Sequence, residues 1–138
     1  MKTSALSDCH ILELPRIYRP SGNITAVNNE IEIPFAVKRV YYLYDVPGGE
    51  ARGGHAHKAL QQLIVAASGS FDITLADGVN KKTFTLSRPY KGLYVPPGLW
   101  RELDNFSSGA ICLVLASTRY TEDDYIRDFA QFTEYKSK

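Results

Sequence analysis

The sequence is poor in cysteine, has no excess of charge of either sign and contains no long hydrophobic run. Its two cysteines, Cys9 and Cys112, form neither a C-x-x-C pair nor a disulfide framework, which favours a reducing compartment. Lys plus Arg number 16 against 15 for Asp plus Glu, so general electrostatic binding to nucleic acid is not expected. No run approaches the roughly 20 apolar residues of a membrane span, and no apolar signal-peptide segment follows Lys2. We expect a cytoplasmic protein with neither nucleic acid nor membrane as a partner.

The chain is instead rich in β-prone sequence punctuated by turns. It has nine tyrosines and six phenylalanines in 138 residues, enough for one domain with its own core. Strand-like runs cover residues 11–17, 24–27, 37–45, 52–58, 60–67, 70–75, 82–86, 92–95, 100–103 and 110–117, and Asp77-Gly78 is a hairpin signal. This spacing predicts an all-β antiparallel sandwich or barrel over residues 1–138, with residues 1–10 as a poorly ordered leader.

The pattern changes only near the C-terminal end. Thr121 is followed three residues later by Asp124, which resembles a helix-capping sequence. Tyr125, Phe129 and Phe132 then recur at helical spacing. We predict one short C-terminal α-helix from about residue 121, with a packing role.

Two of the three histidines, His55 and His57, lie one residue apart in a strand-like segment. Residues i and i+2 of a strand face the same side, so both imidazoles are expected to project together. Gly53 and Gly54 before them permit a bulge and close approach of another group. Two imidazoles aimed into one cavity indicate either a metal site or acid–base chemistry.

The segments around this pair resemble the two motifs of the cupin family. Gly53 or Gly54, with His55, His57, Gln62 and Gly69, is similar to the first motif, and Gly92, Pro96, Gly98, Arg101 and Asn105 are similar to the second. The resemblance implies a double-stranded β-helix, or jelly roll. Metal-binding cupins add a glutamate and a further histidine to the ligand set, where this chain has Gln61 or Gln62 and Arg101. Arginine offers a metal no lone pair, so we expect no metal and assign proton transfer to the imidazoles.

From about Ile11 to Phe132 the chain more closely resembles the bacterial nucleotide-sugar 3,4-ketoisomerases that act on dTDP-4-keto-6-deoxyglucose. The resemblance rests on ordered motifs at residues 33–35, 38–42, 52–58, 92–95 with Trp100, 115–117, and Asp123 or Asp124 with residues 125–127. It implies an isomerase without metal or organic cofactor, built as a homodimeric cupin with the histidine pair as its catalytic element. The product would feed synthesis of 3-amino-3,6-dideoxyhexoses for surface polysaccharides, such as lipopolysaccharide and S-layer glycans, or for antibiotics.

The expected substrate, a dTDP-linked 4-keto-6-deoxyhexose, has an acidic C3–H because the carbanion delocalises into the carbonyl. Either His55 or His57 can take this proton, while the other orients it or supplies the proton at C4. The candidate substrate-binding residues are Arg101, Arg39 and Tyr41 for the developing oxyanion, Arg39, Arg52 and Lys58 for the diphosphate, Gln62 as a pocket donor, and Tyr94 or Trp100 for stacking on thymine.

Three other functions fit the same scaffold. A 3,5-epimerase also removes a proton beside a ketone, but typically with a His–Asp pair and a tyrosine. A metal-dependent small-molecule cupin and a non-catalytic sugar-nucleotide-binding cupin are the others. A small jelly roll exposes strand edges, so we expect a C2 homodimer with an exchanged N-terminal strand.

Overall fold

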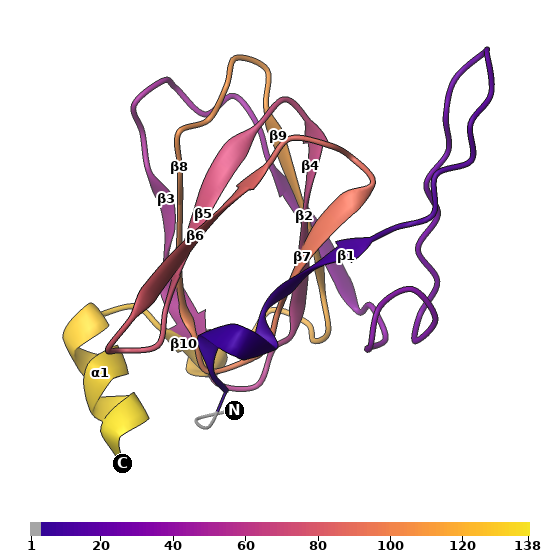
Figure 1. Cartoon of the computed structure of the whole chain (residues 1–138). Helices are drawn as coiled ribbons and strands as arrows, with labels where there is room; N and C mark the ends of the chain where they lie inside the picture. Colours follow the sequence, from indigo (N-terminus) through magenta and orange to yellow (C-terminus); the bar gives the residue numbers. More distant parts are fainter. Residues whose placement is uncertain (1–3) are drawn as a thin grey trace.

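The computed structural model describes residues 4–138, which form two five-stranded antiparallel sheets packed face to face (Figure 1). The first sheet has the order β1-β7-β4-β9-β2 and the second the order β10-β3-β8-β5-β6. The strands are β1 (His10–Glu13), β2 (Arg39–Leu43), β3 (Arg52–His57), β4 (Gln62–Ser68), β5 (Phe71–Ala76), β6 (Lys81–Leu86), β7 (Lys91–Val95), β8 (Trp100–Asp104), β9 (Ile111–Ala116) and β10 (Tyr125–Ile126). The predicted all-β sandwich with a short C-terminal helix is confirmed.

The main core lies between the two sheets. Side chains alternate along each strand, so every second residue enters this core. Ile64, Ile73, Leu93 and Leu103 come from four different strands and are fully buried in one cluster. A second cluster includes Leu63 of β4 with Ile33 and Phe35, which precede β2. Both faces of the first sheet therefore carry apolar residues.

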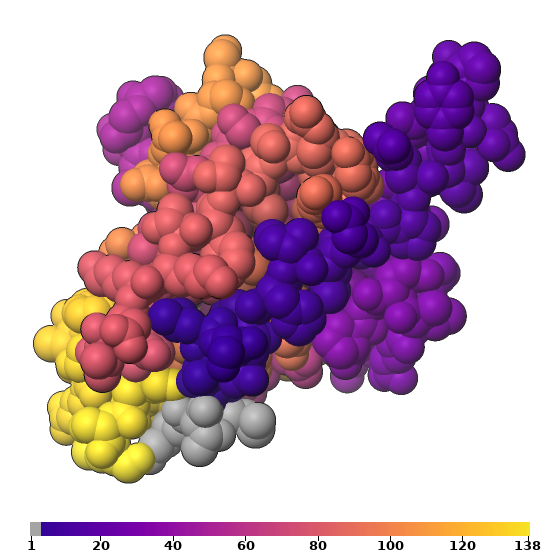
Figure 2. Space-filling view, viewed as in Figure 1, coloured from indigo at the N-terminus to yellow at the C-terminus, as the bar shows by residue number. Residues whose placement is uncertain are grey.

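An arm of irregular chain, residues 14–38, connects β1 with β2 and in part projects beyond the sandwich (Figure 2). Strands were predicted over residues 11–17 and 24–27, but β1 ends at Glu13, and Ile17 and Ile24 form an isolated bridge rather than strands. The physical reason is that an isolated two-stranded ribbon without a neighbouring sheet is marginally stable. Ile17, Tyr18 and Ile24 are accordingly 44%, 67% and 58% exposed.

The N-terminal segment differs from the leader predicted over residues 1–10. Residues 1–3 lie outside the described part of the chain. Leu6–Asp8 form a short 3-10 helix, η1, and Cys9 is buried in the main core. Lys136 of the C-terminal helix donates to the backbone oxygen of Ser4 at 2.8 Å. These contacts attach residues 4–10 to the sandwich, in contrast to the poorly ordered chain predicted for them.

The C-terminal helix begins later than predicted. A 3-10 turn, η2 (Glu122–Asp124), leads into β10, and only then does α1 (Phe129–Ser137) begin. Tyr125 and Ile126 pair with His57 and Ala56, because the edge of β3 offers free backbone groups that a helix over these residues would leave unpaired. Among residues 4–138, no helix has the length and apolar character that a membrane span requires.

Candidate active site

A cavity of about 230 Å³ lies beside β2, β3, β8 and β10. Its lining comprises Arg39, Tyr41, Leu43, Arg52, Gly53, Gly54, His55, Arg101, Tyr125 and Arg127. Four of these ten residues are arginines, and no carboxylate of the described chain is among them. The cavity therefore has the charge needed to bind an anionic group.

The glycines of β3 shape the wall that carries the histidines. Pairing between β3 and β8 shifts register between Arg52 and His55, and Gly53 has a φ of +77°. A side chain at Gly53 would be strained at this φ, so glycine permits the bulge. Beyond the bulge, His55 and His57 are 7% and 3% exposed. The predicted projection of both imidazoles to one side of the strand is confirmed.

The two imidazoles contact each other directly. Their Nε2 atoms are 3.1 Å apart, and the rings meet edge to face at a centroid distance of 4.8 Å. The Nδ1 atom of His57 lies 2.9 Å from Oδ2 of Asp124. The Nε of Arg101, which carries a hydrogen and can only donate, lies 3.2 Å from Nε2 of His55. Asp124, His57, His55 and Arg101 thus form one continuous line of polar contacts, which we call the histidine chain.

Burial and charge keep both imidazoles neutral. Burial first, and then the positive charge of Arg101, lower the pKa of His55 to about 2. The same two causes lower the pKa of His57 to about 4, while the hydrogen bond to Asp124 opposes this lowering. A neutral imidazole has a lone pair and can act as a base. The site therefore holds two unprotonated histidines at neutral pH.

Arg101 enters the interior from β8 and is only 2% exposed. Its Nη2 donates to the hydroxyl oxygen of Tyr41 at 3.0 Å. Its Nη1 and the Oε1 of Gln62 are buried and have no hydrogen-bond partner among the described residues. Gln62 is therefore an interior residue of β4 rather than a surface amide, although it does not line the cavity.

The structure brings together most of the site residues predicted from the sequence. Arg39, Tyr41, Arg52, His55 and Arg101 line the cavity, and His57 adjoins it through His55. Lys58, the further candidate for the diphosphate, is exposed and lies outside the lining.

Tyr94 and Trp100 do not reach the cavity, so the prediction that either stacks on thymine there is not supported. Leu93 and Val95 of β7 enter the core, so Tyr94 faces outward, where its hydroxyl donates to Gln61 at 2.7 Å. Arg101 likewise points inward, so Trp100 faces outward and packs in a cluster with Phe132 of α1. Strand alternation decides both positions.

Three residues of the site, Asp124, Tyr125 and Arg127, were not predicted. The centroid of the Tyr125 ring lies 4.4 Å from that of the His57 ring. The Nε of Arg127 forms an ion pair with Oε1 of Glu122 at 2.7 Å. The sequence contained a signal, since these residues belong to a motif of the ketoisomerase resemblance. The sequence pattern instead assigns Asp124 to a helix-capping sequence and Tyr125 to the packing face of the helix.

The histidine chain does not fit a bound metal. The guanidinium of Arg101, which has no lone pair to offer an ion, lies 3.2 Å from His55. In residues 4–138, no group of three or more His, Cys, Asp or Glu side chains is placed to hold an ion. The residues present thus lack the donor set of a metal site.

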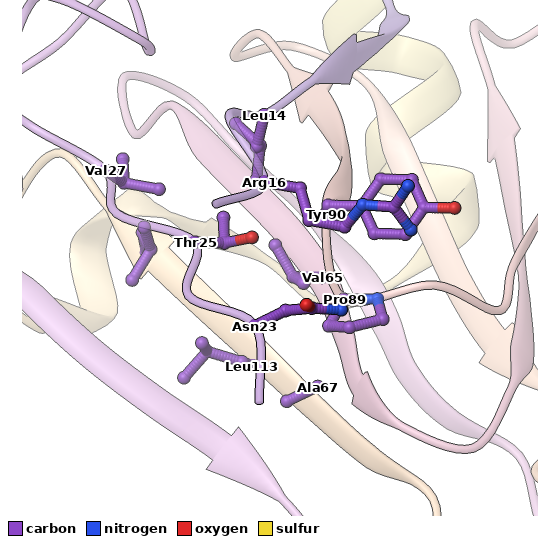
Figure 3. Close-up of a pocket in the computed structure, with 11 residues that line it drawn as sticks. Leu14, Arg16, Asn23, Thr25, Val27, Val65, Ala67, Pro89, Tyr90 and Leu113 are labelled. Carbon is purple, nitrogen blue, oxygen red and sulfur yellow. The ribbon is translucent and has the colours of Figure 1, made fainter. Parts of the chain in front are cut away.

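A larger hollow of about 400 Å³ lies on the outer face of the first sheet, beneath the arm (Figure 3). Its walls are largely apolar and include Leu14, Val65 and Leu113, while Arg16 lies over the ring of Tyr90 at 4.4 Å. No histidine or carboxylate of the described chain lines it.

Comparisons with known proteins agree with this geometry. A family model described as "FdtA: WxcM-like, C-terminal" matches residues 7–137. The chain is 42% identical over 128 residues to a TDP-4-oxo-6-deoxy-alpha-D-glucose-3,4-oxoisomerase of Aneurinibacillus thermoaerophilus, covering 93% of this chain and 92% of the relative.

Solved structures give the same result. A 3,4-ketoisomerase from Helicobacter canadensis is 44% identical, with a TM-score of 0.93 over 95% of this chain and 98% of that one. QdtA, a sugar 3,4-ketoisomerase from Thermoanaerobacterium thermosaccharolyticum solved with TDP, is 36% identical, with a TM-score of 0.94 over 96% and 97% of the two chains. A mutant of QdtA has been solved with TDP-4-keto-6-deoxyglucose.

Proposed function

The chain belongs to the FdtA, WxcM-like family, and from this membership we propose that it is a nucleotide-sugar 3,4-ketoisomerase acting on dTDP-4-keto-6-deoxyglucose. It moves the keto group from C4 to C3 of the hexose. One observation of the site carries the proposal: a buried pair of neutral imidazoles, in contact through Nε2, adjoins a cavity lined by arginines. The whole chain, residues 1–138, is assigned to this one catalytic domain.

The reaction needs a base, a way to stabilise negative charge, and an acid. One histidine removes the C3 proton, and the electron pair enters the C3–C4 bond to give an enediolate. The O3 proton passes to O4, a proton is delivered to C4, and O3 becomes the carbonyl oxygen. A positioned acid–base group contributes about 10²–10⁴-fold to such a step. Every electron stays on the sugar, so the proposal needs no redox cofactor.

We assign stabilisation of the 4-oxo group to Tyr41 and Arg101. The Tyr41 oxygen accepts a hydrogen bond from Arg101, so its own O–H is free to donate into the cavity that it lines. A guanidinium bonded to a phenol oxygen makes the phenol a stronger donor. A preorganised donor aimed at a developing oxyanion contributes about 10²–10³-fold.

Arg39 and Arg52 are proposed to bind the diphosphate. Arg39 lies 4.5 Å from the centre of the Tyr41 ring and 5.2 Å from that of Tyr120, and its Nη1 donates to the Tyr125 hydroxyl at 3.4 Å. These contacts restrict its conformations without neutralising its charge. Arg127 is already paired with Glu122 and has less charge to offer.

Turnover of dTDP-4-keto-6-deoxyglucose in deuterated water tests the proposal. We expect a 3-keto product with deuterium at C4, observed by NMR, because the proton delivered to C4 derives from groups that exchange with solvent. The 3,5-epimerase alternative gains support from the His57–Asp124 pair. It predicts instead a 4-keto product labelled at C3 and C5. Absence of a 3-keto product would contradict the ketoisomerase proposal.

We further propose a homodimer in which the arm contacts a second copy. Ile17, Tyr18 and Ile24 expose apolar surface on a segment that projects from the sandwich. In the single chain, β1 pairs with β7 of the same chain. Exchange of this strand with a second copy stays a prediction. Sedimentation should give about twice the 15.4 kDa of one chain. The double variant Ile17→Asp/Ile24→Asp should sediment as a monomer, and a monomeric parent protein would exclude the dimer.

A cytoplasmic location completes the proposal. Cys9 and Cys112 are both free and buried, which is compatible with a reducing compartment.

A further inference from the structure

The hydrogens of the histidine chain can be assigned from its heavy atoms. A carboxylate only accepts hydrogen bonds, so His57 must donate to Asp124 from Nδ1. A neutral imidazole with its hydrogen on Nδ1 has only a lone pair on Nε2. The Nε2 of His57 must therefore accept the hydrogen in its 3.1 Å contact with Nε2 of His55. His55 then carries its hydrogen on Nε2, and its Nδ1 has the lone pair.

This assignment separates the roles of the two histidines. His55 lines the cavity, whereas His57 lies behind it and is 3% exposed. His57 and Arg101 both engage the Nε2 of His55, so Nδ1 is the nitrogen left to meet a ligand. The lone pair set by Asp124 is thus on the nitrogen of His55 that neither His57 nor Arg101 engages.

We propose that Asp124, His57 and His55 form a proton relay in which Asp124 is a positioning residue that makes Nδ1 of His55 the base. The proposal rests on the ketoisomerase function given above. In the first step the C3–H bond breaks and an N–H bond forms at Nδ1 of His55. The hydrogen on Nε2 of His55 passes to Nε2 of His57. His57 becomes an imidazolium paired with the Asp124 carboxylate. The new hydrogen on Nδ1 of His55 exchanges with water, and the reverse transfers then deliver a solvent-derived proton to C4.

The contact with Arg101 supports this sequence. While Nε2 of His55 carries a hydrogen, it cannot accept the Nε–H of Arg101, which lies 3.2 Å away. After the relay has taken up a proton, that Nε2 has a lone pair and accepts from both His57 and Arg101. All hydrogen bonds of the histidine chain are satisfied together only in this state, in which the relay holds the extra proton on His57. The site is thus complementary to the intermediate, as catalysis requires.

Asparagine at position 124 would reverse the relay with little change in shape. Oδ1 of Asp124 accepts the backbone N–H of Ala59 at 2.7 Å. Because that N–H can only donate, the asparagine oxygen must stay there, and its NH₂ group must face Nδ1 of His57. His57 would then carry its hydrogen on Nε2 and donate to His55. The hydrogen of His55 would move to Nδ1, which removes the lone pair from the base.

We therefore expect Asp124→Asn to lower kcat by about 10³–10⁴-fold, with KM and dTDP affinity within about threefold of the parent. Asp123→Asn is the matched control, because Asp123 is the exposed neighbouring carboxylate and lies outside the histidine chain. Nitrogen-15 NMR of the imidazoles should show the His57 hydrogen on Nδ1 in the parent protein and on Nε2 in Asp124→Asn.

Equal activities of the two variants would overturn the relay, and so would a parent His57 with its hydrogen on Nε2. If Asp124→Asn does not fold, the NMR of the parent protein decides the question alone. A failure of the proposed function would look different from a failure of the relay. The parent protein would then leave dTDP-4-keto-6-deoxyglucose unconverted, whichever nitrogen of His57 carries the hydrogen.

Discussion

Replacing His55 by asparagine is expected to lower kcat by about 10⁴-fold while leaving dTDP affinity within about threefold of the parent value. The substitution removes the only imidazole that lines the described cavity and also interrupts its contact with His57. Loss of a positioned acid–base group costs about 10²–10⁴-fold, and members of a coupled set tend towards the upper value. The arginines proposed to bind the diphosphate are unchanged, so nucleotide binding should survive.

His10→Asn is the matched control for this prediction. His10 is the third histidine of the chain, is exposed, and lies on β1 near Tyr94 rather than in the cavity. Turnover measured by NMR and dTDP binding measured by calorimetry should be unchanged in this variant. A His55→Asn protein with more than about one tenth of the parent kcat would remove His55 from the reaction.

Replacing Arg101 by glutamine is expected to shift the acid limb of the pH profile of kcat/KM to higher pH, by about one to three units. In the parent protein, burial and the Arg101 charge lower the pKa of His55 to about 2 and that of His57 to about 4. The base must be neutral, so parent activity should fall only as the pH drops through these values. Without the arginine charge both pKa values rise, and activity should fall at a higher pH.

The same substitution should lower kcat by about 10²-fold at neutral pH, because Tyr41 loses a donor and Nε2 of His55 loses one in the state in which His57 has taken up the proton. Arg101→Lys keeps the positive charge but not the planar set of donors. It should share the loss in kcat while its acid limb stays near that of the parent protein. If both variants titrate as the parent does, the charge of Arg101 does not control the histidines.

The depressed histidine pKa values also have a consequence for stability. Unfolded histidines take up protons near pH 6.5, while the folded pair does so only near pH 4 and below. Between these values the unfolded state binds more protons, so the parent protein should lose stability as the pH falls through this range. Arg101→Gln should lose less over the same range, measured as the drop in Tm between pH 7 and 4.5 relative to the parent.

Local sequence patterns determined a large part of the molecule. Period-two alternation and regularly spaced turns gave the all-β class. The spacing of His55 and His57 placed both imidazoles on one side of β3, and Gly53 marked the bulge before them. These features depend on residues near one another in the chain, so their stereochemistry is contained in short segments.

The tertiary structure decides which side chains from distant segments meet. The spacing of Tyr125, Phe129 and Phe132 predicted a helix that includes Tyr125. In the structure Tyr125 pairs with the free edge of β3 as part of a strand, so the helix begins only at Phe129. Trp100 and Arg101 are neighbours, and the orientation of β8 in the sandwich sends the arginine to the cavity and the tryptophan to the helix.

The sequence by itself determined that two imidazoles share one side of a strand, which requires only the two-residue repeat of extended backbone. Only the folded chain decided which of them meets a ligand and where its lone pair lies. Asp124 is 67 residues from His57 along the chain, and the 2.9 Å contact between them exists because β10 pairs with β3. No local pattern encodes such a contact, since it depends on how the whole sandwich closes.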